Sequence, residues 1–161
     1  MSGSDALVIL QASVDECAEV LALAEALFAE VEHRSEGDPP ATTRHLLSDA
    51  PDFVALLAWR QSQAVGLLTL SPAVAIYVGG AFGLIHEFYV RPEVRSSGIG
   101  RMLLHEAERI GKRRGWLRLE VTAAPRAVDF YLNNGFEGTG PHLKRLLGPV
   151  EPDHLTSTRP V

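Results

Sequence analysis

The stretch over residues 82–122 limits the possible folds more than any other part of the chain. It combines an apolar strand pattern over residues 82–90, a helical pattern over 99–112 and a second strand pattern over 117–122. Apolar residues at helical spacing indicate the helix, namely Ile99, Met102, Leu103, Ala107 and Ile110. Two strands that are joined by one short helical crossover are expected to be parallel neighbours in a single sheet.

The rest of the chain also mixes strands with helices, so the predicted fold class is α/β of the mixed (α+β) kind. Ser71 and Pro72 are expected to interrupt or end the strand before them. The other expected elements are strands over residues 7–10, 53–59, 64–70 and 143–147, a helix over 17–31 behind a capping box from Ser13 to Glu16, helical turns over 42–48, and a helix from Pro125 to near Gly135.

A length of 161 residues is typical of one domain, which we predict over residues 1–147, followed by a loose tail over 148–161. A hydrophobic fraction of 46% excludes wholesale disorder, and no apolar run is long enough to cross a bilayer. Cys17 is the single cysteine, and it falls on the apolar face of the first helix, where a structural thiol is expected. One cysteine, without a recognisable secretion signal, favours a cytoplasmic location.

The net charge of −5 is unevenly distributed. Residues 1–60 contain 3 Lys and Arg against 11 Asp and Glu, a balance of −8, whereas residues 91–120 contain 8 against 4, a balance of +4. A basic stretch within an acidic protein indicates a local anionic ligand rather than a nucleic-acid surface. Most of these charges are expected to lie on solvated helix faces.

The loop that joins the strand at 82–90 to the following helix contains Arg95, Gly98 and Gly100. A helix N-terminus presents free N–H groups that bind phosphate, and glycines let the backbone approach a pyrophosphate. The alternative is a tight strand-to-helix turn without a ligand. A Rossmann fingerprint is excluded because Leu103 stands where a third glycine is needed, and no Gly-Lys-Ser/Thr triplet of a Walker loop follows.

The segment Arg95-x-x-Gly98-x-Gly100 resembles the acyl-CoA motif of the GNAT N-acetyltransferases, Arg/Gln-x-x-Gly-x-Gly/Ala. A second segment, with Ala127, Phe130-Tyr131 and Gly135-Phe136, resembles the Ala-x-x-Phe-Tyr…Gly-Phe signature of the same family. The match extends over residues 82–136 in order and spacing. The resemblance implies a mostly antiparallel mixed sheet of six to seven strands with a splayed parallel pair, flanked by about four helices.

The resemblance also implies acetyl-CoA as a cosubstrate. Its pantetheine arm would lie in the gap between residues 88–90 and 120–122, and its pyrophosphate would meet the amides of residues 95–101. Ala124 stands where the family often has asparagine, so no amide contact is expected there. The cofactor-binding residues are therefore predicted to be Phe88, Tyr89, Val90, Arg95, Ser96, Ser97, Gly98, Ile99, Gly100, Arg101 and Tyr131.

Acetyl transfer to an amine needs a base, because an alkyl ammonium with a pKa of about 10 has no lone pair for attack. Tyr131 occupies the tyrosine position of the family and is the expected acid for the thiolate leaving group. Glu87 and Glu120 are the two candidate bases, since burying a glutamate in an apolar strand costs free energy unless the carboxylate is paired or has a catalytic role. The structural alternative is an ion pair with Arg118 or Arg126.

The six histidines show no pair at metal-ligand spacing, so no metal is expected. Strand alternation predicts that His86 faces away from Glu87 and is structural, while His33 and His45 are weaker candidates. The predicted function is acetyl transfer to a primary amine on a small molecule or peptide, and the acidic first 60 residues would suit a cationic acceptor. The alternative is a non-catalytic acyl-CoA-binding or regulatory module. No membrane or nucleic-acid partner is expected, and the protein is predicted to be a monomer or homodimer.

Overall fold

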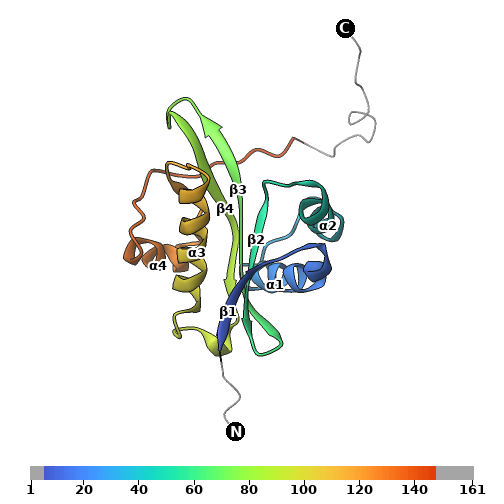
Figure 1. Ribbon diagram of the computed structural model, residues 1–161. Helices are drawn as coiled ribbons and strands as arrows, with labels where there is room; N and C mark the ends of the chain where they lie inside the picture. Colours follow the sequence, from blue (N-terminus) through green and yellow to red (C-terminus); the bar gives the residue numbers. More distant parts are fainter. Residues whose placement is uncertain (1–5, 148–161) are drawn as a thin grey trace.

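The computed structural model describes residues 6–147, and a five-stranded sheet lies at its centre (Figure 1). Its strands are β1 (Leu7–Gln11), β2 (Val54–Arg60), β3 (Gln63–Ala75), β4 (Gly80–Val90) and β5 (Leu119–Val121), in the order β1-β2-β3-β4-β5. The first four strands are antiparallel to their neighbours, and β4 and β5 are parallel. The mixed sheet with one parallel pair is confirmed, with five strands rather than the expected six to seven.

Four α-helices cover the two faces of this sheet (Figure 1). They are α1 (Cys17–Glu30), α2 (Pro39–Asp49), α3 (Ile99–Arg113) and α4 (Val128–Asn133), with short 3-10 turns at Val14–Glu16, Pro92–Val94 and Pro125–Ala127. Helices α1 and α2 lie on one face, and α3 and α4 lie on the other. Within residues 6–147, no helix has the length and apolar character needed to cross a membrane.

The central strands are apolar on both sides because both faces of the sheet are covered. Successive residues of β2 alternate between two cores: Leu56 packs with α3, whereas Leu57 packs with α1. Leu103 of α3 and Leu23 of α1 are each 0% exposed at the centres of these cores. The first helix starts as expected from its capping box, in which the Ser13 N–H donates to Glu16 Oε2 at 2.7 Å. The Ser13 hydroxyl and N–H lower the pKa of Glu16.

Two expectations about the strands are wrong. β3 does not end at Ser71 and Pro72 but continues to Ala75, because β4 pairs with it as far as Ala75. On its other side β2 pairs with β3 only as far as Leu70. Pro72 therefore lies where β3 has a free side, and proline is tolerated there since no ladder bond is lost.

Residues 143–147 form no strand; Leu143 and Leu147 are exposed, so this segment has no buried face against which to pair. The predicted tail at 148–161 lies outside the described residues.

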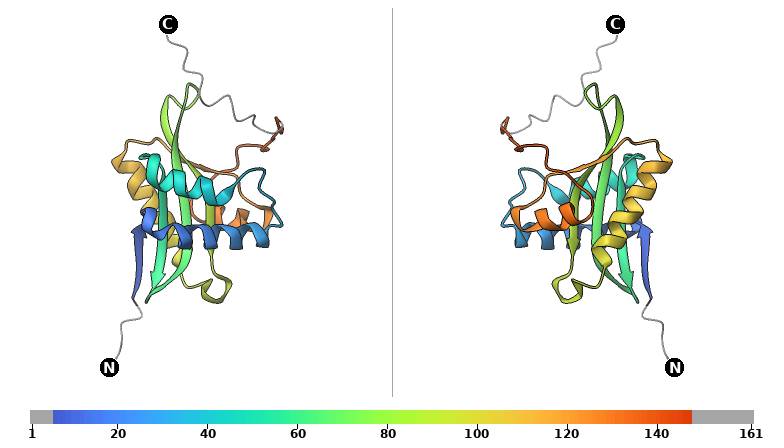
Figure 2. Two further views of the ribbon diagram at one scale, coloured as in Figure 1. Left: turned by 90° about the vertical axis from the view of Figure 1, so that its right-hand side faces the viewer. Right: turned by 90° about the vertical axis from the view of Figure 1, so that its left-hand side faces the viewer.

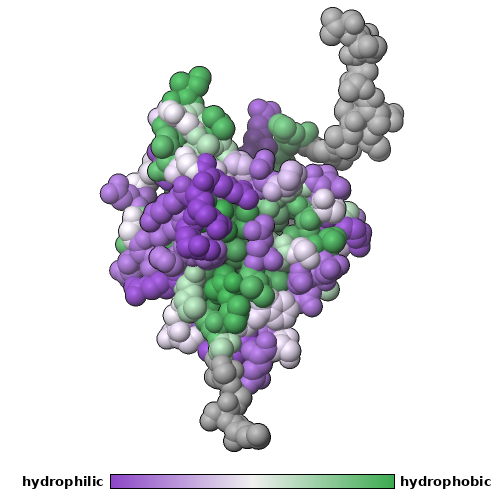
Figure 3. Space-filling model, viewed as in Figure 1, coloured by the Kyte–Doolittle hydropathy of each residue, from purple (hydrophilic) through white to green (hydrophobic). Residues whose placement is uncertain are grey.

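The β3–β4 hairpin extends beyond the helices, as the side views show (Figure 2). Its tip carries the exposed apolar side chains of Val74 and Ile76, and the same tip is largely hydrophobic at the upper left of the surface view (Figure 3). Arg118, in the segment before β5, lies over the ring of Tyr77 at 5.2 Å. The tip of the hairpin therefore contacts the segment that leads into β5, next to the parallel pair where the candidate site begins.

Gly83 of β4 permits the close approach that starts the parallel pair. A methyl group at this position would lie 2.6 Å from Trp116 Cε3 and 2.7 Å from Leu119 Cδ2. We expect Gly83→Ala to lower the free energy of unfolding by about 1–3 kcal/mol, because the neighbouring side chains must move. Chemical denaturation measures the change, and Gly37→Ala, at a glycine with open space around it, is the control. Equal stability of the two variants would contradict this packing.

Candidate functional site

The parallel pair separates halfway along β4. Its register places Gly83, Leu84 and Ile85 opposite residues 119–121, and β5 ends there. β4 continues to Val90, so no strand of the described part of the chain pairs with residues 86–90 on that side. The backbone N–H and C=O groups that point away from β3 along this edge therefore have no strand partner, and within residues 6–147 only the Val90 carbonyl is engaged, by the Arg95 side chain. The opening starts directly after the Ile85–Val121 pair.

A bulge in β4 sits at the start of this opening. Leu68 of β3 is opposite Phe88 and Leu70 is opposite Ile85, so Thr69 faces two residues, His86 and Glu87. A bulge of this kind re-aims side chains. The expectation that His86 and Glu87 face opposite sides of the sheet is therefore wrong: their partners on β3 are only two residues apart and share one face.

Those partners fix both side chains. The Thr69 hydroxyl donates to the Glu87 carboxylate and accepts from the Glu87 N–H at 3.0 Å. His86 Nε2 and Ser71 Oγ are hydrogen-bonded at 2.7 Å. Thr69 is 2% exposed and is the one polar residue counted in the buried core of the described chain. A buried hydroxyl with two hydrogen bonds to one glutamate holds that carboxylate in a set position.

Glu87 and His86 line a cavity of about 490 Å³ on the face of the sheet that carries α2. Most of its wall is apolar and comes from the end of α2, the segment that follows it, and β3. The lining residues are Leu46, Ala50, Pro51, Asp52, Phe53, Ser71, Pro72, His86 and Glu87.

A second cavity, of about 990 Å³, lies beside β5. It is lined by residues 84–86 of β4, by residues 116–123, by the last turns of α3, by α4 and by residues 134–142. Tyr131 of α4 belongs to its wall, and so does His86. His86 therefore lines both cavities, at the point where β4 and β5 separate.

Tyr131 is 7% exposed and lies among three other aromatic rings. Its centroid is 6.0 Å from that of Phe88, 5.4 Å from that of Phe130 and 5.3 Å from that of Phe136, all edge to face. Burial raises the pKa of Tyr131 to about 12, because the phenolate would lose its hydration. The phenol therefore keeps its proton at neutral and moderately alkaline pH.

The first turn of α3 begins at Gly98, whose φ of +84° lies in the left-handed region that favours glycine. No side chain caps this helix, and the first intrahelical bond runs from the Met102 N–H to the Gly98 carbonyl at 3.0 Å. The N–H groups of the first turn thus have no side-chain acceptor, which is the arrangement that binds anions at helix N-termini.

Arg95 and Gly100 of the motif contact other parts of the protein. The Arg95 guanidinium donates to Glu30 Oε2 at 2.6 Å and to the Val90 carbonyl at 2.8 Å, so it lies towards α1. Glu30 raises the pKa of Arg95, and Arg95 lowers that of Glu30. A methyl group on Gly100 would lie 3.4 Å from the Phe130 ring. That distance is an ordinary van der Waals contact, so Gly100 lies beside α4, which carries Tyr131.

Glu120 has the partner that the structural alternative proposed. Arg118 Nε donates to Glu120 Oε1 at 2.8 Å, and the Tyr77 hydroxyl is 3.4 Å from the same oxygen. The Glu120 side chain is 32% exposed at the edge of the second cavity. Its charge is thus balanced by a neighbouring cation.

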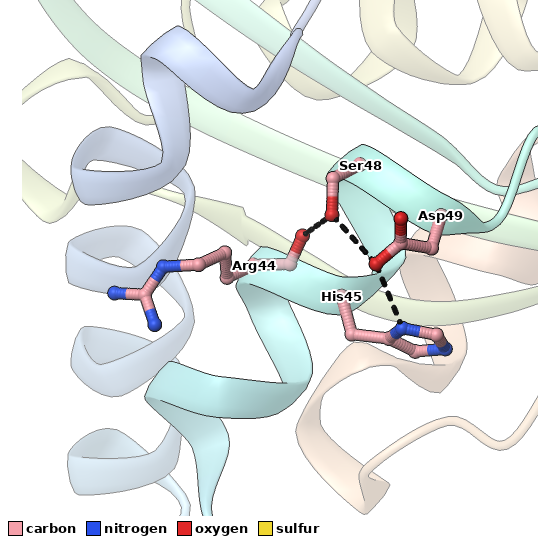
Figure 4. Close-up of polar contacts among 4 residues, drawn as sticks. All are labelled: Arg44, His45, Ser48 and Asp49. Carbon is pink, nitrogen blue, oxygen red and sulfur yellow. Dashed lines mark hydrogen bonds and ion pairs between the residues drawn. The ribbon is translucent and has the colours of Figure 1, made fainter.

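The two weaker histidine candidates lie outside both cavities. His45 Nδ1 is 3.2 Å from Asp49 Oδ2 on the exposed face of α2, where Ser48 also donates to the Asp49 carboxylate (Figure 4). His33 packs edge to face on Phe28 at 5.5 Å. Among residues 6–147, no three His, Cys, Asp or Glu side chains are grouped so as to hold a metal ion.

Sequence reasoning missed three polar residues of the cavity beside α2 and its support, Thr69, Ser71 and Asp52, and gave the fourth, His86, a structural role only. A signal existed for Thr69, because a hydroxyl in the apolar run 64–70 needs a partner once it is buried. His86 and Ser71 carried no such signal, since their pairing depends on the bulge. Asp52 lies in a polar turn and resembled any loop residue.

Comparison with known proteins agrees with this architecture. Residues 18–136 match the Acetyltransferase (GNAT) family. The chain is similar to an "IAA acetyltransferase" from Azospirillum brasilense, with 33% identity over 125 residues, which cover 73% of this chain and 75% of that protein.

Solved structures share the fold at lower identity. One is a protein from Clostridium acetobutylicum, described as a predicted acetyltransferase and solved with acetyl-CoA, with TM-score 0.76, 16% identity, and coverage of 88% of this chain and 97% of that one. Another is a ribosomal-protein-alanine N-acetyltransferase from Brucella melitensis biovar Abortus, with TM-score 0.73, 18% identity, and coverage of 89% and 100%. A third is an aminoglycoside acetyltransferase from an uncultured soil metagenomic sample, with TM-score 0.75, 22% identity, and coverage of 91% and 100%. With the family match over residues 18–136 and the relative at 33% identity, these similarities identify the chain as a member of the GNAT family of acetyltransferases.

Proposed function

We propose that this acetyltransferase moves the acetyl group of acetyl-CoA to a primary amine by direct attack. The observation that carries the proposal is the meeting of two cavities at His86, where β4 and β5 separate. Glu87 lines the cavity beside α2, and Tyr131 lines the one beside β5. Two substrates that enter from these sides would meet between a candidate base and a candidate acid.

The backbone supports binding of acetyl-CoA more than the side chains do. The free edge of β4, over residues 86–90, suits the amides of a pantetheine arm, and the uncapped first turn of α3 suits a pyrophosphate. The Arg95 guanidinium is held towards α1 by Glu30, a carboxylate that also contacts Arg126 at 2.8 Å. We therefore assign the anion site to the amides of residues 95–101 rather than to this side chain. Ala124 contributes no polar side chain.

For the base we favour Glu87 over Glu120. An amine with a pKa of about 10 arrives mostly as an ammonium, so its proton must leave as the nitrogen attacks the thioester carbonyl carbon. Glu87 is held by Thr69 at the wall of the cavity beside α2, which suits removal of this proton directly or through water. Glu120 is engaged by Arg118, so we propose that it stabilises the start of β5.

For the acid we propose Tyr131. When the carbon–sulfur bond breaks, the thiolate must gain a proton, and the phenol of Tyr131 carries one over the whole neutral range. The surroundings that raise its pKa also raise the proton affinity of a thiolate formed beside it. The products are an N-acetyl amide and free CoA thiol, with no covalent enzyme intermediate and no metal.

The alternative is a non-catalytic module that binds acyl-CoA. Isothermal titration with acetyl-CoA, combined with a thiol-release assay over a panel of amines, separates the two. We expect saturable binding together with amine-dependent release of thiol. Binding without release on any amine would favour the module, and absence of binding would contradict both. The single cysteine, free and half-buried, suits the reducing cytoplasm in which we place the protein.

Gly98 offers a direct test of the anion site. Gly98→Ala forces a side chain into the left-handed region at the start of α3, at a cost of about 1–2 kcal/mol, and so disturbs the amides that we assign to the pyrophosphate. We expect acetyl-CoA to bind at least about tenfold more weakly, as measured by titration calorimetry.

Gly79→Ala is the matched control, because Gly79 has a φ of +80°, open space around it and a position in the β3–β4 turn away from α3. It should lose similar stability and keep the affinity for acetyl-CoA. Equal affinity in both variants would mean that this loop does not bind the anion.

A further inference from the structure

The names of the relatives indicate different acceptors, so the acceptor of this chain must be read from its own cavity. We infer that the 490 Å³ cavity beside α2 binds a primary amine whose body is apolar and which carries a single positive charge, rather than a polycation. This inference rests on the proposed function and assigns a substrate class to the same site.

The wall of the cavity is suited to an apolar body. Leu46, Phe53 and Pro72 provide aliphatic and aromatic surface from three different segments. The volume lies within the range typical of small-molecule sites, which are lined mainly by apolar side chains with a few polar groups that set orientation. An alkyl or arylalkyl group would be removed from water here without leaving a polar group unpaired.

The polar groups are concentrated at one end. Glu87 and His86 lie side by side on β4, each fixed by a hydroxyl of β3, and His86 also borders the cavity that we assign to acetyl-CoA. An ammonium directed to Glu87 would therefore point towards the thioester. The other carboxylate of the lining, Asp52, lies in an exposed segment at the rim, where water screens its attraction for a second cation.

A pair of acceptors of equal length tests this assignment. Hexylamine and hexamethylenediamine differ by a terminal ammonium in place of a methyl group. We expect kcat/KM for hexylamine to exceed that for the diamine by about tenfold or more, because the second charge must be placed against an apolar wall. Titration of each amine into protein saturated with CoA should give the same preference in affinity.

Leu46→Asp changes the wall and should reverse this preference. Leu46 is half-buried on α2 and belongs to neither core, so the variant is expected to fold, which a thermal melt checks. The new carboxylate should lower kcat/KM for hexylamine and raise it for the diamine, so that the diamine becomes the better acceptor. Thr42→Asp, on the exposed part of the same helix outside the lining, adds the same charge and should keep the wild-type ratio.

The outcomes separate the two claims. Equal or better use and binding of the diamine by the wild type would overturn the inference, and so would a Leu46→Asp variant with an unchanged ratio, or failure of both amines to bind. Preferential binding of hexylamine without acetylation of any amine would leave the inference standing and overturn the proposed function.

Discussion

Tyr131→Phe is expected to slow acetyl transfer by about 10²-fold, because the variant lacks the proton donor for the departing thiolate. The ring remains, so its edge-to-face contacts with Phe88, Phe130 and Phe136 are kept. Folding and acetyl-CoA affinity should therefore change little. Single-turnover kinetics measure the chemical step apart from product release.

Tyr89→Phe is the matched control for loss of a hydroxyl. Tyr89 is also 7% exposed; its backbone belongs to the edge that we assign to the pantetheine arm, but its ring packs in the core on the α1 face and does not line the cavity beside β5. We expect its single-turnover rate to stay close to that of the wild type. A Tyr131→Phe variant that turns over as fast as Tyr89→Phe would remove Tyr131 from the mechanism.

The raised pKa of Tyr131 also sets a pH dependence. Since its pKa is about 12 in the folded protein, loss of rate from its ionisation is expected only as the pH approaches that value. In the unfolded chain a tyrosine ionises near pH 10, so the folded state holds this proton more tightly. The stability that this group contributes is therefore present below about pH 10 and is lost as the pH rises towards 12.

Glu87→Gln should lower kcat/KM by about 10²-fold at neutral pH, because an amide of the same shape cannot accept the proton. The deficit should shrink as the pH approaches about 10, where the acceptor amine is itself increasingly deprotonated. The measurement is the pH–rate profile of the variant against that of the wild type, with thermal melts of both proteins.

Two further variants make this prediction specific. Thr69→Val keeps the shape of a residue that is 2% exposed but removes the hydroxyl that positions the Glu87 carboxylate, so a fall in kcat with little change in KM for acetyl-CoA is expected. Glu120→Gln loses an ion pair with Arg118 and should keep the wild-type profile. If Glu120→Gln rather than Glu87→Gln changed the pH profile, the roles of the two glutamates would be exchanged.

Local patterns were sufficient to predict the parallel pair and the loop before α3. The apolar face of residues 99–112 and the short crossover determine that β4 and β5 lie side by side, and both depend only on spacing along the chain. The Ser13–Glu16 capping box is equally local. Features of this kind are specified within a few residues of sequence.

Features that depend on pairing across the sheet were not predictable in this way. The bulge that turns His86 towards Glu87 is a one-residue shift between β3 and β4, and no residue type in either strand marks it. Arg95 contacts Glu30 across 65 residues of sequence, and its motif gave no indication of this partner. Pro72 was misjudged because the sequence does not reveal where β2 ends.

The most direct test of the account follows the acetyl group itself. Acetyl-CoA labelled with ¹³C in its carbonyl carbon is incubated with the wild-type protein and hexylamine, and the label and the free thiol are quantified together. We predict that the label appears in the amide of the amine in a one-to-one ratio to the CoA thiol released, with none attached to the protein. Label that remains on CoA across a broad panel of amines, or that accumulates on the protein, would contradict direct transfer at the junction of the two cavities.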